Sequence, residues 1–328
     1  MNLFLVTSPL QYICAVEARE HLRCKNNILV LMNQNGTHGL TQQRKIVNLK
    51  DWDYVIEIER GNRSFVFPKV IREVKKLLNT KRLSHFFYAE YNAWWTKLLI
   101  RNLPIDKEIY FDDGTLTLLE YQKFILTENE FYRPRLIQDF VVRCNGSKPI
   151  GRLAQSENLE IFTMFDLKPS KFTIHKNSLE TLKSKYGHPT LYDEKAPIGF
   201  IGQGAIGDKN QKTIDEYLAE ILKISHDEQK EILYFPHRTE KQSVRDTLIK
   251  SGKVKYHCSE YPLEIELIDK KIKLSSLIGT FSTVMFSCRL LYPKMPIYSI
   301  SSNYPDKAFE LELKEQMLSN NIKEFIAK

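Results

Sequence analysis

The chain has 328 residues, of which 42% are hydrophobic and 27% charged. This composition excludes a disordered or fibrous chain and predicts a soluble globular protein of two domains. A formal net charge of +8 favours anionic partners, but no nucleic-acid-binding motif accompanies it, so we expect no nucleic acid. Five cysteines without a Cys-x-x-Cys pair predict reduced thiols in the cytoplasm, with no zinc site and no disulfide framework.

The first half of the chain alternates between strand and helix patterns. Its apolar start, residues 2–6, is too short for a signal peptide or a membrane span and reads as a buried strand. Ser8 then suits the N-cap of a helix, and Pro9 suits its first position. Strands are predicted at 2–6, 28–32, 54–59, 85–88 and 108–111, and helices at 10–22, from about 42, at 68–80 and at 92–102. This alternation predicts a parallel sheet with helices on both faces.

The pattern weakens after residue 116, and we expect 160–164 to be the last strand of this half. A polar stretch with Pro169, Gly187 and Pro189 then predicts a connection between domains. Further strands are predicted at 197–201, 232–235, 253–257, 272–278 and 296–300, and further helices at 212–223, 241–250, 262–268, 282–291, 306–318 and 321–327. We therefore predict an N-terminal Rossmann-like domain at 1–168, a linker at 169–195 and a C-terminal Rossmann-like domain at 196–328, whose last helix can return to the first domain.

The helix predicted at 68–80 has two interpretations. Its apolar residues recur at helical spacing, and the basic residues off that stripe are Lys69, Arg72, Lys75, Lys76, Lys81 and Arg82. The basic residues form either an ordinary solvated face or a face that rests on an anionic membrane surface.

An acidic pair, Asp112 and Asp113, follows the strand predicted at 108–111 and precedes Gly114. An Asp-Gly pair is a common turn. Two carboxylates at the end of a strand can also present a general acid or base to a cleft. The residues alone leave both interpretations open.

The stretch from Gly202 to Gly207, which includes Gln203 and Gly204, matches the G-x-G-x-x-G pattern after a strand. An NAD site would also need an acidic residue at the end of the next strand, where this chain has Pro236 and His237. The glycines also fit a tight turn or a close approach of the backbone to a ligand.

Several polar residues stand at strand ends and helix starts of the second half: Pro236, His237, Arg238, Glu264, Thr280, Ser282 and Thr283. His237 and Arg238 suit a phosphate, although a packing histidine and a surface arginine are the alternative interpretation. Ser282 suits a helix N-cap, and the same geometry offers hydroxyls and free N–H groups to an anion. Glu264 stabilises the start of a helix and can also accept hydrogen bonds from ribose hydroxyls.

In their order along the chain these elements resemble the bacterial sialyltransferases, most closely glycosyltransferase family 52 with its polysialyltransferase relatives. The resemblance covers most of the chain. The matching segments are residues 2–11, Asp112-Asp113-Gly114, Gly202-Gln203, Pro236-His237-Arg238, Pro262 to Glu264, and Ser282-Thr283. In one respect the chain departs from the pattern, because the proline that follows the family's motif histidine is replaced by Arg238.

The resemblance implies a GT-B fold, in which two Rossmann-like domains face a cleft, and an inverting transfer that needs no cofactor and no essential metal. It implies a CMP-activated nonulosonic acid as donor and a surface glycan, such as lipooligosaccharide or capsule, as acceptor. Asp113 is expected to be the general base and Asp112 to point toward the structure, although the assignment between the two stays open. His237, Ser282 and Thr283 would stabilise the leaving phosphate. The other donor contacts would be Gly202, Gln203, Pro236, Arg238, Glu264 and Thr280, and the acceptor side would have Ser8, Gln11 and Gly114.

Three alternatives remain at this point. The donor sugar can be pseudaminic acid, legionaminic acid or Kdo rather than sialic acid. The stretch from Gly202 to Gly207 can belong to an NAD-dependent oxidoreductase. The chain can also be a non-catalytic glycan-binding module. The sequence predicts neither the linkage nor the oligomeric state.

Overall fold

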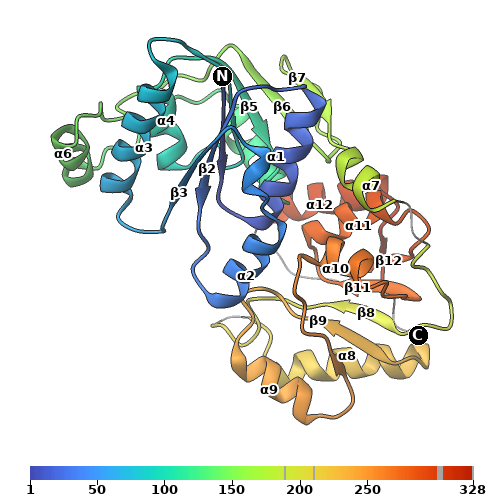
Figure 1. Ribbon diagram of the computed structural model, residues 1–328. Helices are drawn as coiled ribbons and strands as arrows, with labels where there is room; N and C mark the ends of the chain where they lie inside the picture. Colours follow the sequence, from blue (N-terminus) through green and yellow to red (C-terminus); the bar gives the residue numbers. More distant parts are fainter. Residues whose placement is uncertain (188–189, 210, 301–305, 327–328) are drawn as a thin grey trace. The chain divides into compact units, whose positions relative to one another are not determined.

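The computed structural model describes residues 1–187, 190–209, 211–300 and 306–326. The chain forms two compact units, an N-terminal unit (Met1–Thr181) and a C-terminal unit (Leu182–Lys328). Each unit is built on its own parallel sheet (Figure 1). The prediction of two Rossmann-like α/β units is confirmed.

The N-terminal sheet has the order β3-β2-β1-β4-β5-β6-β7. Its strands are β1 (Asn2–Val6), β2 (Asn27–Met32), β3 (Tyr54–Ile58), β4 (Leu83–Tyr88), β5 (Ile105–Phe111), β6 (Leu159–Thr163) and β7 (Thr173–Lys176). Its helices are α1 (Pro9–His21), α2 (Thr37–Ile46), the 3-10 helix η1 (Leu49–Asp51), α3 (Arg63–Leu78), α4 (Trp94–Asn102), α5 (Leu116–Glu120), the π-helix η2 (Tyr121–Ile125) and α6 (Leu136–Cys144). Strands β2 and β3 lie on one side of β1, and strands β4 to β7 lie on the other. Ligands bind in such sheets at the point between β1 and β4 where the strand order reverses.

Both faces of β1 are buried, because successive side chains of a strand point to opposite faces. Leu3 and Leu5 belong to a core with residues of α3 and α4. Phe4 stacks on Phe87 of β4 at 4.0 Å between ring centres, on the other face. The continuous apolar run at 2–6 therefore reflects a central strand.

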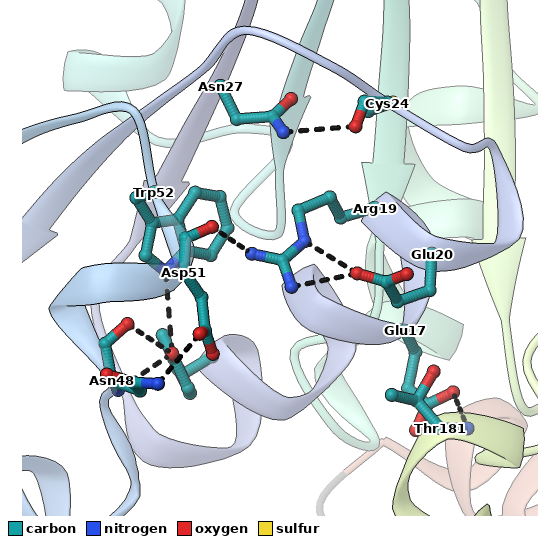
Figure 2. Close-up of polar contacts among 10 residues, drawn as sticks. Glu17, Arg19, Glu20, Cys24, Asn27, Asn48, Asp51, Trp52 and Thr181 are labelled. Atoms are coloured by element: carbon teal, nitrogen blue, oxygen red, sulfur yellow. Dashed lines mark hydrogen bonds and ion pairs between the residues drawn. The ribbon is translucent and has the colours of Figure 1, made fainter.

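Helix α1 is fixed to the connection between β2 and β3 (Figure 2). The Arg19 guanidinium donates to the carbonyl oxygen of Asp51 at 2.6 Å and also to the Glu20 carboxylate. Farther along the chain, the backbone N–H of Thr181 donates to Glu17 at 2.9 Å. These contacts hold the helix whose first turn carries Ser8 and Gln11.

Two expectations for the N-terminal unit were wrong. Helix α3 begins at Arg63 rather than Pro68, because the Asn62 side chain caps it by accepting from the N–H of Ser64. The strand at Thr173–Lys176 (β7) lies inside the predicted linker and pairs in parallel with β6. The sheet therefore extends past residue 168, and the predicted domain boundary is too early.

The C-terminal sheet has the order β10-β9-β8-β11-β12-β13. Its strands are β8 (Ile198–Ile201), β9 (Ile232–Phe235), β10 (Lys255–Tyr256), β11 (Ser276–Gly279), β12 (Ile297–Ser299) and β13 (Lys323–Glu324). Its helices are α8 (Ile214–Glu228), α9 (Gln242–Lys250), α10 (Leu263–Asp269), α11 (Thr283–Leu291) and α12 (Lys307–Ser319), and α7 (Glu180–Tyr186) spans the division between the units.

The last element of the chain corrects another expectation. A helix was predicted at 321–327, but Lys323 and Glu324 form β13, which pairs in parallel with β12. The N–H of Phe325 donates to the carbonyl oxygen of Ser299 at 2.7 Å, which continues the pairing. Residue 327 lies outside the described residues. Within the described ranges, no helix is long and apolar enough to cross a membrane.

Candidate functional site

The two carboxylates after β5 have opposite environments. Asp112 is fully buried and accepts from the Thr163 hydroxyl at 2.5 Å and from the N–H of Met164 at 2.7 Å. Desolvation raises the pKa of Asp112 to about 7, although these hydrogen bonds act in the opposite direction. Asp112 therefore fastens the end of β5 to the end of β6.

Asp113 is only partly buried and is held by the first turn of α1. Its Oδ1 accepts from Nε2 of Gln11 at 2.8 Å, and its own N–H donates to the Thr117 hydroxyl at 2.9 Å. Gln11 cannot rotate freely, because its Oε1 accepts from the N–H of Thr7 at 2.7 Å. Gly114 has a φ of +69°, a conformation that glycine adopts without strain. The chain thus turns away immediately after Asp113 and leaves its carboxylate at the sheet edge.

The first turn of α1 forms as the sequence predicts. The Ser8 side chain caps α1 by accepting from the N–H of Gln11 at 3.2 Å, and Pro9 occupies the first helical position. The structure thus brings Gln11, Asp113 and Gly114 together. Ser8 contributes by accepting from the backbone N–H of Gln11.

Two further carboxylates lie near Asp113 and were missed by sequence reasoning. Glu90 follows β4, and burial together with the Asp113 charge raises its pKa to about 7. Glu120 is buried and accepts from the N–H groups of Tyr91 at 2.8 Å and Asn92 at 2.9 Å, and burial raises its pKa. Glu90 had a signal in the sequence, since it follows a predicted strand as Asp112 and Asp113 do.

In the C-terminal unit, three loops leave the same edge of the sheet. Ile201 of β8 pairs with Phe235 of β9 on one side and with Gly279 of β11 on the other. The segments that follow these three residues begin with Gly202, Pro236 and Thr280. The edge lies beside the reversal point between β8 and β11, where a ligand is expected in an open parallel sheet.

The glycines of the 202–207 loop allow close packing. A Cβ on Gly202 would lie 2.9 Å from the carbonyl oxygen of Phe235, and one on Gly204 would lie 2.8 Å from Nδ1 of His237. Helix α8 begins only at Ile214, so the loop does not open directly into a helix, as a dinucleotide-binding loop does. The glycines therefore allow the loop to pack closely against the 236–239 segment. Gln203, which stands between Gly202 and Gly204 in the sequence, is half-buried.

His237 is exposed and presents one defined ring nitrogen. Its Nδ1 accepts from the N–H of Thr239 at 3.2 Å and lies 2.8 Å from the Thr239 hydroxyl. Because a backbone N–H can only donate, the neutral ring carries its proton on Nε2. Desolvation of the ring and the neighbouring Arg238 charge lower the pKa of His237. The ring is therefore a neutral hydrogen-bond donor, beside half-buried Pro236 and exposed Arg238.

Ser282 occupies the N-cap position of α11 but does not cap it. Its backbone is extended, and its side chain makes no capping hydrogen bond. The first N–H groups of a helix have no partner within the helix, so an uncapped start can bind an anion. Thr280 is buried, whereas Ser282 and Thr283 are half-buried at this start.

Glu264 is more enclosed than the ribose interpretation assumed. It is 4% exposed, and the Ser287 hydroxyl of α11 donates to it at 3.4 Å. Burial raises its pKa. The carboxylate that organises the preceding loop is Glu266, which accepts from Nε2 of His257 at 2.8 Å and from the N–H of Tyr261 at 2.8 Å. Within the described residues, no group of three or more His, Cys, Asp or Glu side chains is arranged to hold a metal ion.

Comparison with known proteins identifies the family to which the chain belongs. A sequence model of glycosyltransferase family 52 matches residues 25–301, which is most of the chain. The chain belongs to glycosyltransferase family 52. No curated protein matched the chain.

Solved structures agree in fold. The α/β-galactoside α-2,3-sialyltransferase of Photobacterium phosphoreum is 12% identical with a TM-score of 0.55, over 98% of this chain and 97% of that one. The UDP-GlcNAc 2-epimerase of Methanocaldococcus jannaschii, in complex with UDP-GlcNAc and UDP, is 14% identical with a TM-score of 0.55, over 100% of this chain and 89% of that one. At these identities the likeness shows the fold alone. The family-52 chain is thus a glycosyltransferase with the two Rossmann-like units of the GT-B fold.

Proposed function

We propose that this glycosyltransferase transfers sialic acid, or a related nonulosonic acid, from its CMP donor to a hydroxyl of a surface glycan. The transfer inverts the anomeric centre and needs no metal. Family membership supports glycosyl transfer. The observation that carries the mechanism is the contrast between buried Asp112 and partly exposed Asp113, whose carboxylate is oriented by Gln11 at 2.8 Å.

In the proposed reaction, Asp113 removes the proton from the acceptor hydroxyl. The acceptor oxygen forms a bond to the anomeric carbon, and the bond from that carbon to the phosphate oxygen of CMP breaks. CMP leaves with the electron pair of the broken bond, and Asp113 later releases the proton to water. A general base of this kind contributes about 10²–10⁴ in rate.

The leaving phosphate would be stabilised by neutral donors. His237 offers its Nε2–H, and the start of α11 offers the Ser282 hydroxyl and the positive end of the helix dipole. Such preorganised donors stabilise charge that develops in the transition state. A nucleoside monophosphate leaving group suits this set, since it carries less charge than a diphosphate.

The choice of donor is tested by CMP release. The protein is incubated separately with CMP-sialic acid, CMP-pseudaminic acid, CMP-legionaminic acid and CMP-Kdo, with a galactose-terminated glycan as acceptor. We expect turnover of at least one of them, most readily CMP-sialic acid. Thermal stabilisation by NAD but not by CMP, with no CMP-sugar consumed, would overturn the proposal in favour of an oxidoreductase.

We also propose that the protein works in the cytoplasm, docked on an anionic membrane that holds a glycolipid acceptor. Besides the exposed basic residues of α3, helix α6 supports this. Its side chains Leu136, Ile137 and Phe140 are 85%, 78% and 65% exposed, whereas Val142 is buried. At 100° per residue these three point away from Val142, so the apolar face of α6 is turned toward solvent.

The charges around α6 suit an anionic surface. Arg133 and Arg135 immediately precede α6, Arg143 lies in its last turn, and Arg72 of α3 donates to the carbonyl oxygen of Asn145 at 3.5 Å. An apolar face bordered by arginines is typical of helices that lie in a membrane interface.

Sedimentation with phosphatidylglycerol-containing vesicles tests this docking. Leu136→Ser with Phe140→Ser is expected to weaken binding more than tenfold, because each buried apolar side chain contributes about 1.5–3 kcal/mol. The control Leu318→Ser alters a side chain that is 72% exposed elsewhere and should bind as the wild type does. Equal binding of all three proteins, or none to begin with, contradicts the docking proposal.

A further inference from the structure

A cavity of about 220 Å³ lies within the N-terminal unit, beside the carboxyl end of β4. Its lining combines aromatic rings, amides and charged side chains, among them Tyr91, Asn92, Lys97, Phe124, Arg133 and Gln155. It also includes one carboxylate, Glu130, which pairs with Arg152 at 3.0 Å. The mechanism proposed above uses none of these residues. The volume is below the roughly 300 Å³ at which pockets for drug-sized ligands begin, so it suits a single small group.

Lys97 of α4 brings a cation into this lining that makes no salt bridge with a described carboxylate. It is 5% exposed, and its Nζ lies 3.5 Å from the centre of the Tyr91 ring. A fully buried lysine ordinarily pairs with a carboxylate. Here Glu108 and Glu120 act only through their charges, and burial lowers the pKa of Lys97 to about 8 against their effect. The ammonium remains mostly protonated at neutral pH, and no described carboxylate is in contact with it.

Gln155 supplies an unpaired acceptor to the same cavity. Its Nε2 donates to the Tyr91 hydroxyl at 2.8 Å and to the carbonyl oxygen of Ile125 at 3.1 Å. Because a carbonyl can only accept, the amide orientation is fixed. Its Oε1 is buried and, within the described part of the chain, has no hydrogen-bond partner. Buried groups of this kind normally find a partner in a ligand or in water.

We propose that this cavity binds one acidic monosaccharide unit, with its anionic group at Lys97 and a hydroxyl donating to Oε1 of Gln155. Phe124 and Tyr91 offer apolar surface to the sugar ring. A carboxylate and a phosphate satisfy Lys97 equally well, so the ligand is defined by its negative charge. In assigning this sugar to the acceptor glycan, the inference rests on the proposed function.

The position of the cavity fits an acceptor subsite. Tyr91 and Asn92 line it, and their backbone N–H groups donate to Glu120. The Glu120 carboxylate in turn interacts electrostatically with Asp113. The cavity and the proposed base therefore belong to neighbouring strand ends of the same unit.

Binding of free sugars to the full-length protein tests the cavity. Ligand-detected NMR is recorded with sialic acid, which carries a carboxylate, with glucose 6-phosphate, and with neutral glucose. The wild type is expected to bind at least one acidic sugar and not glucose, and the comparison of the two acids identifies the anionic group. Lys97→Met, which keeps the length of the side chain, is expected to weaken acidic-sugar binding at least tenfold. Lys148→Met, at an exposed lysine, is the control and should change nothing.

Two further measurements keep the outcome clear. In the wild type, acidic-sugar binding should weaken as the pH rises through about 8, because Lys97 then loses its charge. CMP release by the wild type from the donor without acceptor is measured separately, so a failure of the proposed function appears there and not in sugar binding. Equal binding of acidic and neutral sugars, or undiminished binding in Lys97→Met, overturns the inference.

Discussion

Replacement of Asp112 by asparagine separates a structural carboxylate from a catalytic one. Burial raises the pKa of Asp112 to about 7 in the folded protein, against an ordinary value of 3.8. The folded state therefore keeps this proton to higher pH than the unfolded chain does. The stability that this provides is fully present below about pH 3.8 and is lost as the pH rises toward about 7. The two pKa values differ by about 3, and each pKa unit corresponds to 1.36 kcal/mol, so the free energy of unfolding falls by about 4 kcal/mol.

The amide of the Asp112→Asn variant does not titrate, so the variant escapes this loss. Urea unfolding of both proteins at pH 5 and pH 8 measures the effect, and the difference between variant and wild type cancels the titration of other groups. The wild type loses this stability over about three pH units, and about two of them lie between pH 5 and pH 8. The variant should therefore gain about 3 kcal/mol of stability relative to the wild type from pH 5 to pH 8. An equal difference at both pH values would refute the assignment of a desolvated Asp112, and with it the division of roles between the two aspartates.

Three other substitutions test the two strand-end sites. Gln11→Met removes the amide that orients Asp113, and loss of a hydrogen bond to a charged group, about 1.5–3 kcal/mol, should lower kcat/KM about 10- to 100-fold with CMP binding unchanged in calorimetry. Gly204→Ala would place a Cβ 2.8 Å from Nδ1 of His237 and should weaken CMP binding about tenfold, whereas Gly61→Ala, with its nearest atom at 3.8 Å, should have no effect. His237→Ala should lower kcat about 10²–10³-fold, as expected when a donor to developing charge is removed, and a kcat within twofold of wild type would remove His237 from the mechanism.

Much of the fold follows from local pattern. The run at 2–6, the Ser8 cap and Pro9 predict β1 and α1 because burial on both faces and capping leave signals in adjacent residues. β7 (Thr173–Lys176) left no such signal, since its side chains are exposed or half-buried and its stability comes from pairing with β6. β13 (Lys323–Glu324) is shorter still and depends on β12. Pairing with a distant strand cannot be read from a segment of two to four residues.

Some residues of the candidate site could likewise be predicted from the sequence, and others could not. Residues at strand ends, such as Asp113, His237 and Ser282, could be found because the carboxyl edge of a parallel sheet is where ligands gather. Gln11 was included for its place in the opening segment, but its contact with Asp113 spans 102 residues and appears only in the structure. Lys97 lies in an ordinary helical pattern, and only its burial without a salt bridge to a described carboxylate distinguishes it.

The central claim is that Asp113 is the general base, and Asp113→Asn tests it most directly. Single-turnover transfer from CMP-sialic acid and CMP affinity by calorimetry are measured on the same preparations of wild type and variant. We predict that transfer falls about 10²–10⁴-fold while CMP affinity stays within twofold, because the amide keeps the shape of the carboxylate but cannot take a proton. Transfer within a few-fold of wild type, or a parallel loss of CMP binding, would contradict the claim.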